Sequence, residues 1–294
     1  MLPNIPVNAR WSKNGNTVID GLNQPRGLSI NQQTGTVFVA DHIKNRIVAW
    51  TPGENSEGRV VAGGKGQGKG LNQLDRPTDV LFDGSTNSII ISDDDRVMRW
   101  SLEEGTKQGE KIIGGIYCKG LTIDKDGALY ITDWLRHEVK RYPRGDTTGI
   151  VVAGGNGEGN ALNQFKWPYY IAVDDEGSIY VSDNDNHRVM KWSNGKPEIV
   201  AGDGTKGDSS SQLNRPEGIL IDDSGTLYVA DRDNHRVTRW RRGEKTGEII
   251  VGTGESGRQA HQLNQPIGLS FDRHGNLYVA DRDNNRVQRF DIQQ

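Results

Sequence analysis

Histidine, aspartate and arginine recur together at fixed spacing in this 294-residue chain, and such groups can bind metal ions. His137, His187 and His235 each stand four residues after an aspartate in three successive copies of one segment. Zinc requires its nitrogen ligands about 2.0–2.1 Å from the metal, so ligands from separate copies would have to meet. We expect the copies to lie too far apart for that. The pattern instead predicts a tight turn capped by Asp and Asn, with Arg paired to a carboxylate.

Two further segments resemble parts of ion-binding or phosphate-binding loops. Asp183-Asn184-Asp185-Asn186 begins like a calcium loop but lacks the glycine at position 6 and the glutamate at position 12. The segment 63–70 contains Gly-x-x-x-x-Gly-Lys, but Gly70 stands where Ser or Thr would hold magnesium. No helix is expected after it to present an N-terminus to a phosphate. The sequence therefore predicts no metal ion and no cofactor.

The large aromatic residues fall into two groups. One group occurs once per copy, which predicts packing in the core: Trp50, Trp100, Tyr142, Trp192, Trp240 and Phe290. The other group does not recur and is concentrated in the third and fourth copies: Tyr117, Trp134, Trp167, Tyr169 and Tyr170. These residues either fill space beside a shortened connection or form a binding surface.

Composition narrows the possible functions. The chain has 36 basic and 39 acidic residues, a balance that argues against a generally basic nucleic-acid-binding protein. Its single cysteine, Cys118, excludes a disulfide framework and a thiolate zinc site. No run of 18 apolar residues or known catalytic motif occurs. We expect a soluble monomer without a membrane partner, in the cytoplasm or secreted as a trimmed mature chain.

The recurring aspartate marks six copies of one unit. The six positions are Asp41, Asp93, Asp133, Asp183, Asp231 and Asp281, at spacings of 52, 40, 50, 48 and 50 residues. Each copy holds short segments rich in aliphatic and aromatic residues, bounded by Gly, Asn and Asp, which is the signal of β-strands. In the fifth copy these segments are 218–222, 227–230, 236–240 and 248–251. Six copies of four strands predict an all-β, closed six-bladed β-propeller of antiparallel blades, as a single domain over residues 1–294.

The two ends of the chain complement each other. The last copy stops at Phe290 and lacks a fourth strand. Residues 16–21 resemble the fourth strands of the other copies. Pairing this segment with the last blade would close the ring and remove exposed strand edges.

The repeated motifs resemble those of the NHL-repeat family of six-bladed propellers. The shared pattern is Asn-x-Pro-x-Gly-Leu followed by Gly-x-Leu-Tyr-Val-Ala-Asp-x-x-Asn-His-Arg-Val, and it covers roughly residues 16–290. The third copy departs from it, with Cys118 in place of proline and no long connector. The resemblance implies the fold. It does not imply one activity, because related propellers bind RNA or proteins or act as enzymes, and the lactonases and lyases hold a divalent ion in the axial channel.

Positions that differ between copies and face the channel mouth are the candidates for ligand binding. The residue after each proline, or after Cys118, forms the mouth slot: Arg26, Thr78, Lys119, Tyr169, Glu217 and Ile267. The residue after each recurring aspartate forms the turn slot: His42, Asp94, Trp134, Asn184, Arg232 and Arg282. The predicted ligand-binding residues are Trp134, Trp167, Tyr169, Lys119, Asn184, Arg26, His42, Glu217, Arg232 and Arg282. No catalytic or metal-binding residue is predicted.

These observations favour a non-catalytic binding scaffold whose loop face takes a protein, peptide or glycan. The principal site is expected between the third and fourth blades, at Trp134, Trp167 and Tyr169. One alternative is a metal-dependent hydrolase or lyase related to lactonases. The other is a single-stranded RNA-binding domain that would use Arg26, Arg76, Lys119, Arg215, Arg232 and Arg282.

Overall fold

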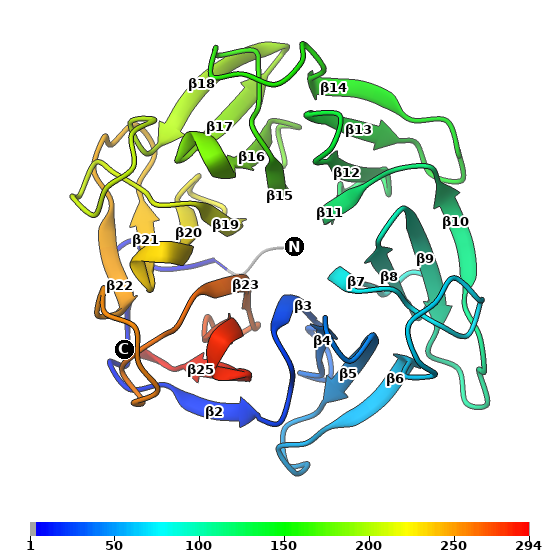
Figure 1. The fold of residues 1–294 in the computed structure, drawn as a ribbon. Helices are drawn as coiled ribbons and strands as arrows, with labels where there is room; N and C mark the ends of the chain where they lie inside the picture. Colours follow the sequence, from blue (N-terminus) through cyan, green and yellow to red (C-terminus); the bar gives the residue numbers. More distant parts are fainter. Residues whose placement is uncertain (1–3, 294) are drawn as a thin grey trace.

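The computed structural model describes residues 4–293 as six four-stranded antiparallel sheets around a central axis (Figure 1). This confirms the predicted six-bladed propeller. The expected domain, 1–294, includes residues 1–3 and 294, which lie outside the described residues. Apart from three-residue 3-10 turns the described chain is strand and loop, and no helix in it is long and apolar enough to cross a membrane.

Each blade runs from an inner strand at the axis to an outer strand at the rim. Blade 1 contains β3 (Pro25–Ile30), β4 (Val37–Asp41), β5 (Arg46–Trp50) and β6 (Arg59–Gly63). Blade 2 contains β7 (Pro77–Asp83), β8 (Ser88–Asp93), β9 (Arg96–Ser101) and β10 (Glu110–Gly114). Blade 3 contains β11 (Cys118–Ile123), β12 (Leu129–Asp133), β13 (Glu138–Tyr142) and β14 (Ile150–Gly154).

The other three blades follow the same order, with the last one completed by the N-terminal segment. Blade 4 contains β15 (Pro168–Val173), β16 (Ile179–Asp183), β17 (Arg188–Ser193) and β18 (Lys196–Ala201). Blade 5 contains β19 (Pro216–Ile221), β20 (Leu227–Asp231), β21 (Arg236–Trp240) and β22 (Glu248–Gly252). Blade 6 contains β23 (Pro266–Phe271), β24 (Leu277–Asp281), β25 (Arg286–Phe290) and β2 (Asn16–Ile19).

The core lies between adjacent blades. Every residue of the second strands β4 and β20 is buried, because each of these strands is covered by a neighbouring blade on both faces. The once-per-copy aromatics are all buried as predicted, from Phe290 with no exposed area to Trp50 at 7%. They therefore pack the core and take no direct part in a surface site.

The ring is closed at two places. β2 pairs with β25, with Asn16 opposite Arg289, which confirms the predicted N-terminal closure. A second contact follows, because β1 (Arg10–Trp11) pairs with β26 (Ile292–Gln293). Trp11 is buried against Tyr228 and Phe271, and its indole N–H donates to the carbonyl oxygen of Gly275 at 2.9 Å. No repeat-based signal predicts this second contact.

The recurring Asp, His and Arg residues join the blades. Asp231 accepts the backbone N–H of Asn214 at 2.7 Å and the Arg236 guanidinium at 2.8 Å. His235 lies in the left-handed region with φ 50°, and its Nδ1 accepts the backbone N–H of Gln265 in the next blade at 3.2 Å. His187 and His137 make the equivalent contacts with the residues that precede Pro216 and Pro168. These contacts agree with the structural role predicted for the repeated segment.

The connectors between blades also contribute to the core. Four long connectors each insert one fully buried side chain between blades, namely Leu74, Phe165, Leu213 and Leu263. The short connection between β10 and β11 lacks such a loop, and Ile116 and Cys118 are buried there instead at 1% exposure each. Burial raises the pKa of the Cys118 thiol to about 12, so it remains protonated. Small aliphatic and sulfur-containing groups thus occupy the space beside the shortened connection.

Candidate functional site

The six inner strands β3, β7, β11, β15, β19 and β23 surround the axis (Figure 1). They begin at the end of the channel where the turns between second and third strands also lie, since Cys118 and Pro168 pair with Asp133 and Asp183. We call this end the loop face and the opposite end the far face. The mouth slot and the turn slot therefore meet at the loop face, as the topology predicts.

An aromatic wall lies at the junction of blades 3 and 4. The ring of Trp134 lies 6.1 Å from that of Trp167 and 6.4 Å from that of Tyr117, edge to face in both cases. Trp167 keeps 39% of its surface exposed, although its backbone has a positive φ of 58° that is unusual for a bulky residue. The ammonium of Lys119 lies 5.5 Å from the centre of the Trp134 ring and 5.6 Å from that of Tyr169. The structure thus brings the predicted aromatic residues and Lys119 together.

Glu217 is the buried carboxylate of the loop-face mouth, with 1% of its surface exposed. Its Oε1 accepts the Arg232 guanidinium at 2.9 Å and the Asn184 amide at 3.4 Å. Among the described residues its Oε2 has no hydrogen-bond partner. Burial raises the Glu217 pKa, opposed by the positive charges of Arg232, Arg26 and Lys119. One buried acceptor oxygen is therefore free beside several cations.

Two cations of the mouth have no carboxylate of their own. Within residues 4–293 neither Arg26 nor Lys119 forms an ion pair, and the buried Nε of Arg26 has no hydrogen-bond partner. Burial and the charge of Arg26 lower the Lys119 pKa to about 8. By contrast, Arg232 is paired with Glu217 and Asp233, and Arg282 lies 3.5 Å from Asp283. The mouth therefore holds two cations without a paired carboxylate among residues 4–293.

The remaining predicted residues complete the same ring. His42 is buried, and burial, with the charge of Arg26, lowers its pKa to about 3. The neutral imidazole then donates from Nδ1 to the Pro77 carbonyl oxygen at 3.1 Å. Arg282 donates to the side-chain oxygens of Gln265 and Gln24. Burial lowers the Arg282 pKa most, and the nearby charges of Arg26 and Arg232 lower it further. All ten predicted residues lie around the loop-face mouth.

The channel is divided below this mouth by Tyr170, which belongs to the non-recurring aromatic group but is not one of the ten predicted ligand-binding residues. The next slot of the inner strands holds glycine in four blades but Asp79 and Tyr170 in the other two. The strands approach so closely there that a Cβ on Gly218 would lie 2.2 Å from the carbonyl oxygen of Ile267. The buried Tyr170 side chain reaches from blade 4 to blade 2 and donates to the Thr78 carbonyl oxygen at 3.2 Å. The replacement of the recurring glycine by Tyr170 is the sequence signal that could have identified this partition.

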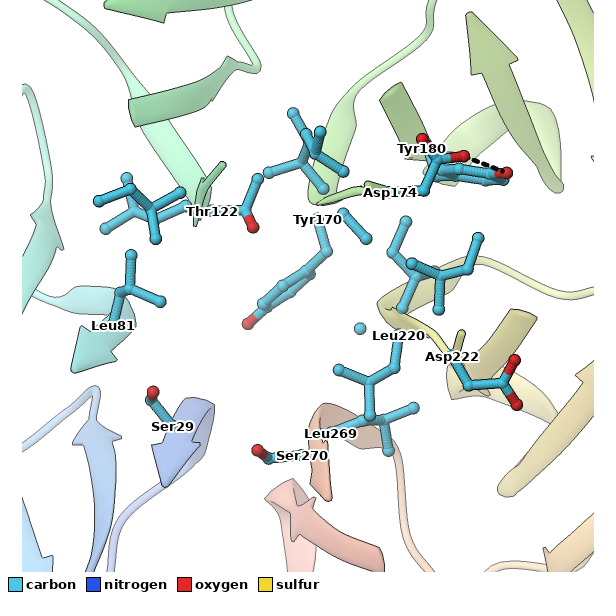
Figure 2. Close-up of a pocket in the computed structure, with 18 of the residues that line it drawn as sticks. Ser29, Leu81, Thr122, Tyr170, Asp174, Tyr180, Leu220, Asp222, Leu269 and Ser270 are labelled. Atoms are coloured by element: carbon cyan, nitrogen blue, oxygen red, sulfur yellow. Dashed lines mark hydrogen bonds between the residues drawn. The ribbon is translucent and has the colours of Figure 1, made fainter. Parts of the chain in front are cut away.

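The far side of this partition is a pocket of about 520 Å³ (Figure 2). Figure 2 shows the Tyr170 ring in the middle of the channel, with Leu81, Leu220 and Leu269 around it. Hydroxyl groups of Ser29, Thr122 and Ser270 interrupt this apolar lining. The turn aspartates at its rim are held by tyrosines, since the Tyr180 hydroxyl donates to Asp174 at 3.1 Å.

A divalent cation of the kind held by related lactonases does not fit these residues. In the part of the chain that the structure describes, no three His, Cys, Asp or Glu side chains are grouped as metal ligands. The mouth carboxylate Glu217 is already bound by Arg232, and Arg26 and Lys119 would repel a metal ion placed beside it. Asp79, deeper in the channel, accepts the backbone N–H groups of Val80 and Leu121, and burial raises its pKa to about 7.

Comparison with known proteins supports the class of fold. The NHL-repeat model matches residues 165–192, 213–240 and 263–290, which lie in blades 4, 5 and 6 and the connectors before them. The chain is a six-bladed β-propeller that contains NHL repeats.

Solved structures with the same fold include proteins that are named for different functions. An auxiliary nutrient-binding protein from Bacteroides thetaiotaomicron matches with TM-score 0.71 and 18% identity, over 100% of this chain and 75% of its own. A gluconolactonase from Xanthomonas campestris matches with TM-score 0.67 and 14% identity, over 99% and 97%. A virginiamycin B lyase from Staphylococcus aureus matches with TM-score 0.60 and 11% identity, over 97% and 100%. At these identities the similarity establishes the fold alone.

Proposed function

We propose that the protein is a binding module that holds its ligand at the loop-face mouth. The observation that carries this proposal is the aromatic wall of partly buried Trp134 and exposed Trp167 beside two cations, Arg26 and Lys119, that lack ion-pair partners within residues 4–293. Buried polar groups are normally hydrogen-bonded. Free polar atoms beside exposed aromatic faces are typical of a site that a ligand completes.

The geometry favours a small ligand unit, such as a sugar or a side chain, over an extended nucleic acid. Of the six basic residues that an RNA-binding face would use, Arg215 lies 3.3 Å from Asp185, and Arg232 and Arg282 are also paired with carboxylates, which leaves three without an ion pair among residues 4–293. The aromatic wall offers flat apolar faces on which a sugar ring or an aromatic side chain can pack. The nutrient-binding name of one structural relative is compatible with this function.

The test is to screen the protein against glycan and peptide arrays with and without the aromatic wall. We expect the Trp134→Ala/Trp167→Ala variant to lose at least about tenfold in affinity for any ligand found, because stacking and burial on both rings are removed. Leu162→Ala is the control, since Leu162 is 50% exposed on a connector outside the two slots. A variant that loses much stability but keeps full ligand affinity would show that the two tryptophans only fill space, and the proposed site would be wrong.

A further inference from the structure

Resting on the proposed function, we infer that the ligand of the loop-face mouth is an acidic saccharide, whose carboxylate binds between Arg26 and Lys119 while its ring packs on the aromatic wall. Three features of the mouth carry this inference: the unpaired cations, the position of Lys119 beside two rings, and the free oxygen of Glu217.

The cations require an anion. Arg26 and Lys119 occupy the same slot on β3 and β11, and each is close enough to the other for repulsion to lower the Lys119 pKa. A carboxylate placed between them would relieve this repulsion. The free Nε–H of Arg26 belongs to a planar group that binds carboxylates through two parallel hydrogen bonds.

The rings place a flat group next to that anion. Because the Lys119 ammonium lies 5.5 Å from the Trp134 ring and 5.6 Å from the Tyr169 ring, a carboxylate bound to Lys119 brings the rest of its molecule against these rings. Tyr169 keeps a neutral hydroxyl there, since burial raises its pKa to about 12. A pyranose ring presents an apolar face to aromatic side chains and hydroxyl groups at its edge.

Glu217 distinguishes a sugar from other carboxylates. Its free Oε2 needs a hydrogen-bond donor, but Arg26, Lys119 and Arg232 around it would repel an ammonium group on the ligand. A neutral hydroxyl satisfies the oxygen without added charge. A carboxylate, a flat apolar face and several adjacent hydroxyls are combined in one unit of a uronic acid, whereas a peptide C-terminus carries at most one hydroxyl in its last residue.

Calorimetric titration with trimers of galacturonate and of mannuronate, at pH 7 and low salt, tests the inference. We expect at least one trimer to bind, its methyl ester to bind at least tenfold more weakly, and its affinity to fall as salt is raised. Arg26→Gln should weaken binding of the trimer about tenfold, and Arg26→Lys should weaken it less. Arg59→Gln makes the same charge change at an exposed outer-strand position and should leave binding unchanged.

The outcomes separate this inference from the proposed function. Equal affinity for trimer and methyl ester, absence of binding by both trimers, or no effect of Arg26→Gln in a variant with the native circular dichroism spectrum would overturn the acidic saccharide. If a neutral oligosaccharide or a peptide binds instead and Trp134→Ala weakens it, the proposed function stands without an acidic ligand. If Trp134→Ala leaves the affinity for every bound probe unchanged, the proposed site is wrong as well.

Discussion

The two ends of the channel are lined by the same six strands, yet their chemistry differs. The loop-face mouth contains Arg26, Lys119 and Glu217 beside an aromatic wall. The far-face pocket is lined by leucines and by the hydroxyls of Ser29, Thr122 and Ser270 (Figure 2). Tyr170 separates the two. Repetition of the blade thus fixes where side chains stand around the axis, while the residue placed in each slot decides what that end of the channel can bind.

The two ends of the channel also differ in how their charged groups are satisfied. At the rim of the far-face pocket Asp174 and Asp222 are hydrogen-bonded within their own turns, and charged side chains of both signs, such as Lys191, Glu176 and Arg242, also line it. Among residues 4–293, the two cations Arg26 and Lys119 have no ion-pair partner and one oxygen of Glu217 has no hydrogen-bond partner. Such a region lowers stability and is typical of functional sites.

The largest expected effect comes from removing the partition. Tyr170→Ala should lower the free energy of unfolding by about 3–5 kcal/mol, as for other large buried aromatic residues, and join the two ends of the channel. Tyr170→Phe should cost only about 1 kcal/mol, because it loses the hydrogen bond to Thr78 but keeps the ring. Urea denaturation measures both. Similar losses for the two variants would mean that the ring is not a packed partition.

The buried ion pair of the mouth should have the next largest effect. Glu217→Ala removes the more deeply buried of the two carboxylates paired with Arg232, leaving Asp233, and should cost about 3 kcal/mol. Thr122→Val, the comparison on the far face, should change stability by less than about 0.5 kcal/mol. Chemical denaturation of Glu217→Ala, Arg232→Ala and the double variant gives the coupling. If the stability losses of the two single variants simply add in the double variant, Glu217 and Arg232 do not interact as the ion pair requires.

Much of this architecture could be predicted because it repeats. Asp231 and His235 have counterparts in other blades, so their turn role was visible, and the topology then placed Arg26, Lys119 and Glu217 at one mouth. Two features could not be predicted in this way. Trp11 meets Tyr228 and Phe271 through a contact that no other blade has.

The second feature is the direction of individual side chains. The sequence shows that Tyr170 replaces a glycine, but its reach to Thr78 depends on how closely the inner strands approach one another. In the same way, the sequence left two roles open for Trp134 and Trp167. The space beside the short connection contains Ile116 and Cys118, and Trp167 remains partly exposed. These outcomes depend on packing between blades, which a periodic pattern does not specify.

A smaller effect of opposite sign is expected for Arg26. Arg26→Gln removes one of the unpaired cations and should raise the free energy of unfolding by about 0.5–1 kcal/mol at low salt. The gain should shrink at high salt, where repulsion from Lys119 is screened. Arg59→Gln should show no such gain. Thermal melts at two salt concentrations measure the difference, and destabilisation by Arg26→Gln would show that Arg26 has a structural partner.

The smallest expected effect is a change in ligand affinity with pH, and it follows from Lys119. Burial and Arg26 lower the Lys119 pKa to about 8, while Glu217, Cys118 and Asp94 act in the opposite direction. An anion binds the protonated form more tightly, so affinity for the uronate trimer should be highest below pH 8 and fall as pH rises through it. His42 and Tyr169, with pKa values of about 3 and about 12, keep their charge over this range.

The control for this titration is Lys119→Arg, which keeps the positive charge at all pH values used. Its affinity should be nearly constant from pH 7.5 to 9, whereas the unmodified protein should lose about twofold to fivefold, because one of its two unpaired cations becomes neutral. If the affinity of both proteins changes near pH 7, that change indicates titration of Asp79, because burial raises the pKa of Asp79 to about 7. If the decline above pH 8 persists unchanged in Lys119→Arg, Lys119 is not the group that binds the carboxylate. A different titrating group would then set the pH dependence of binding.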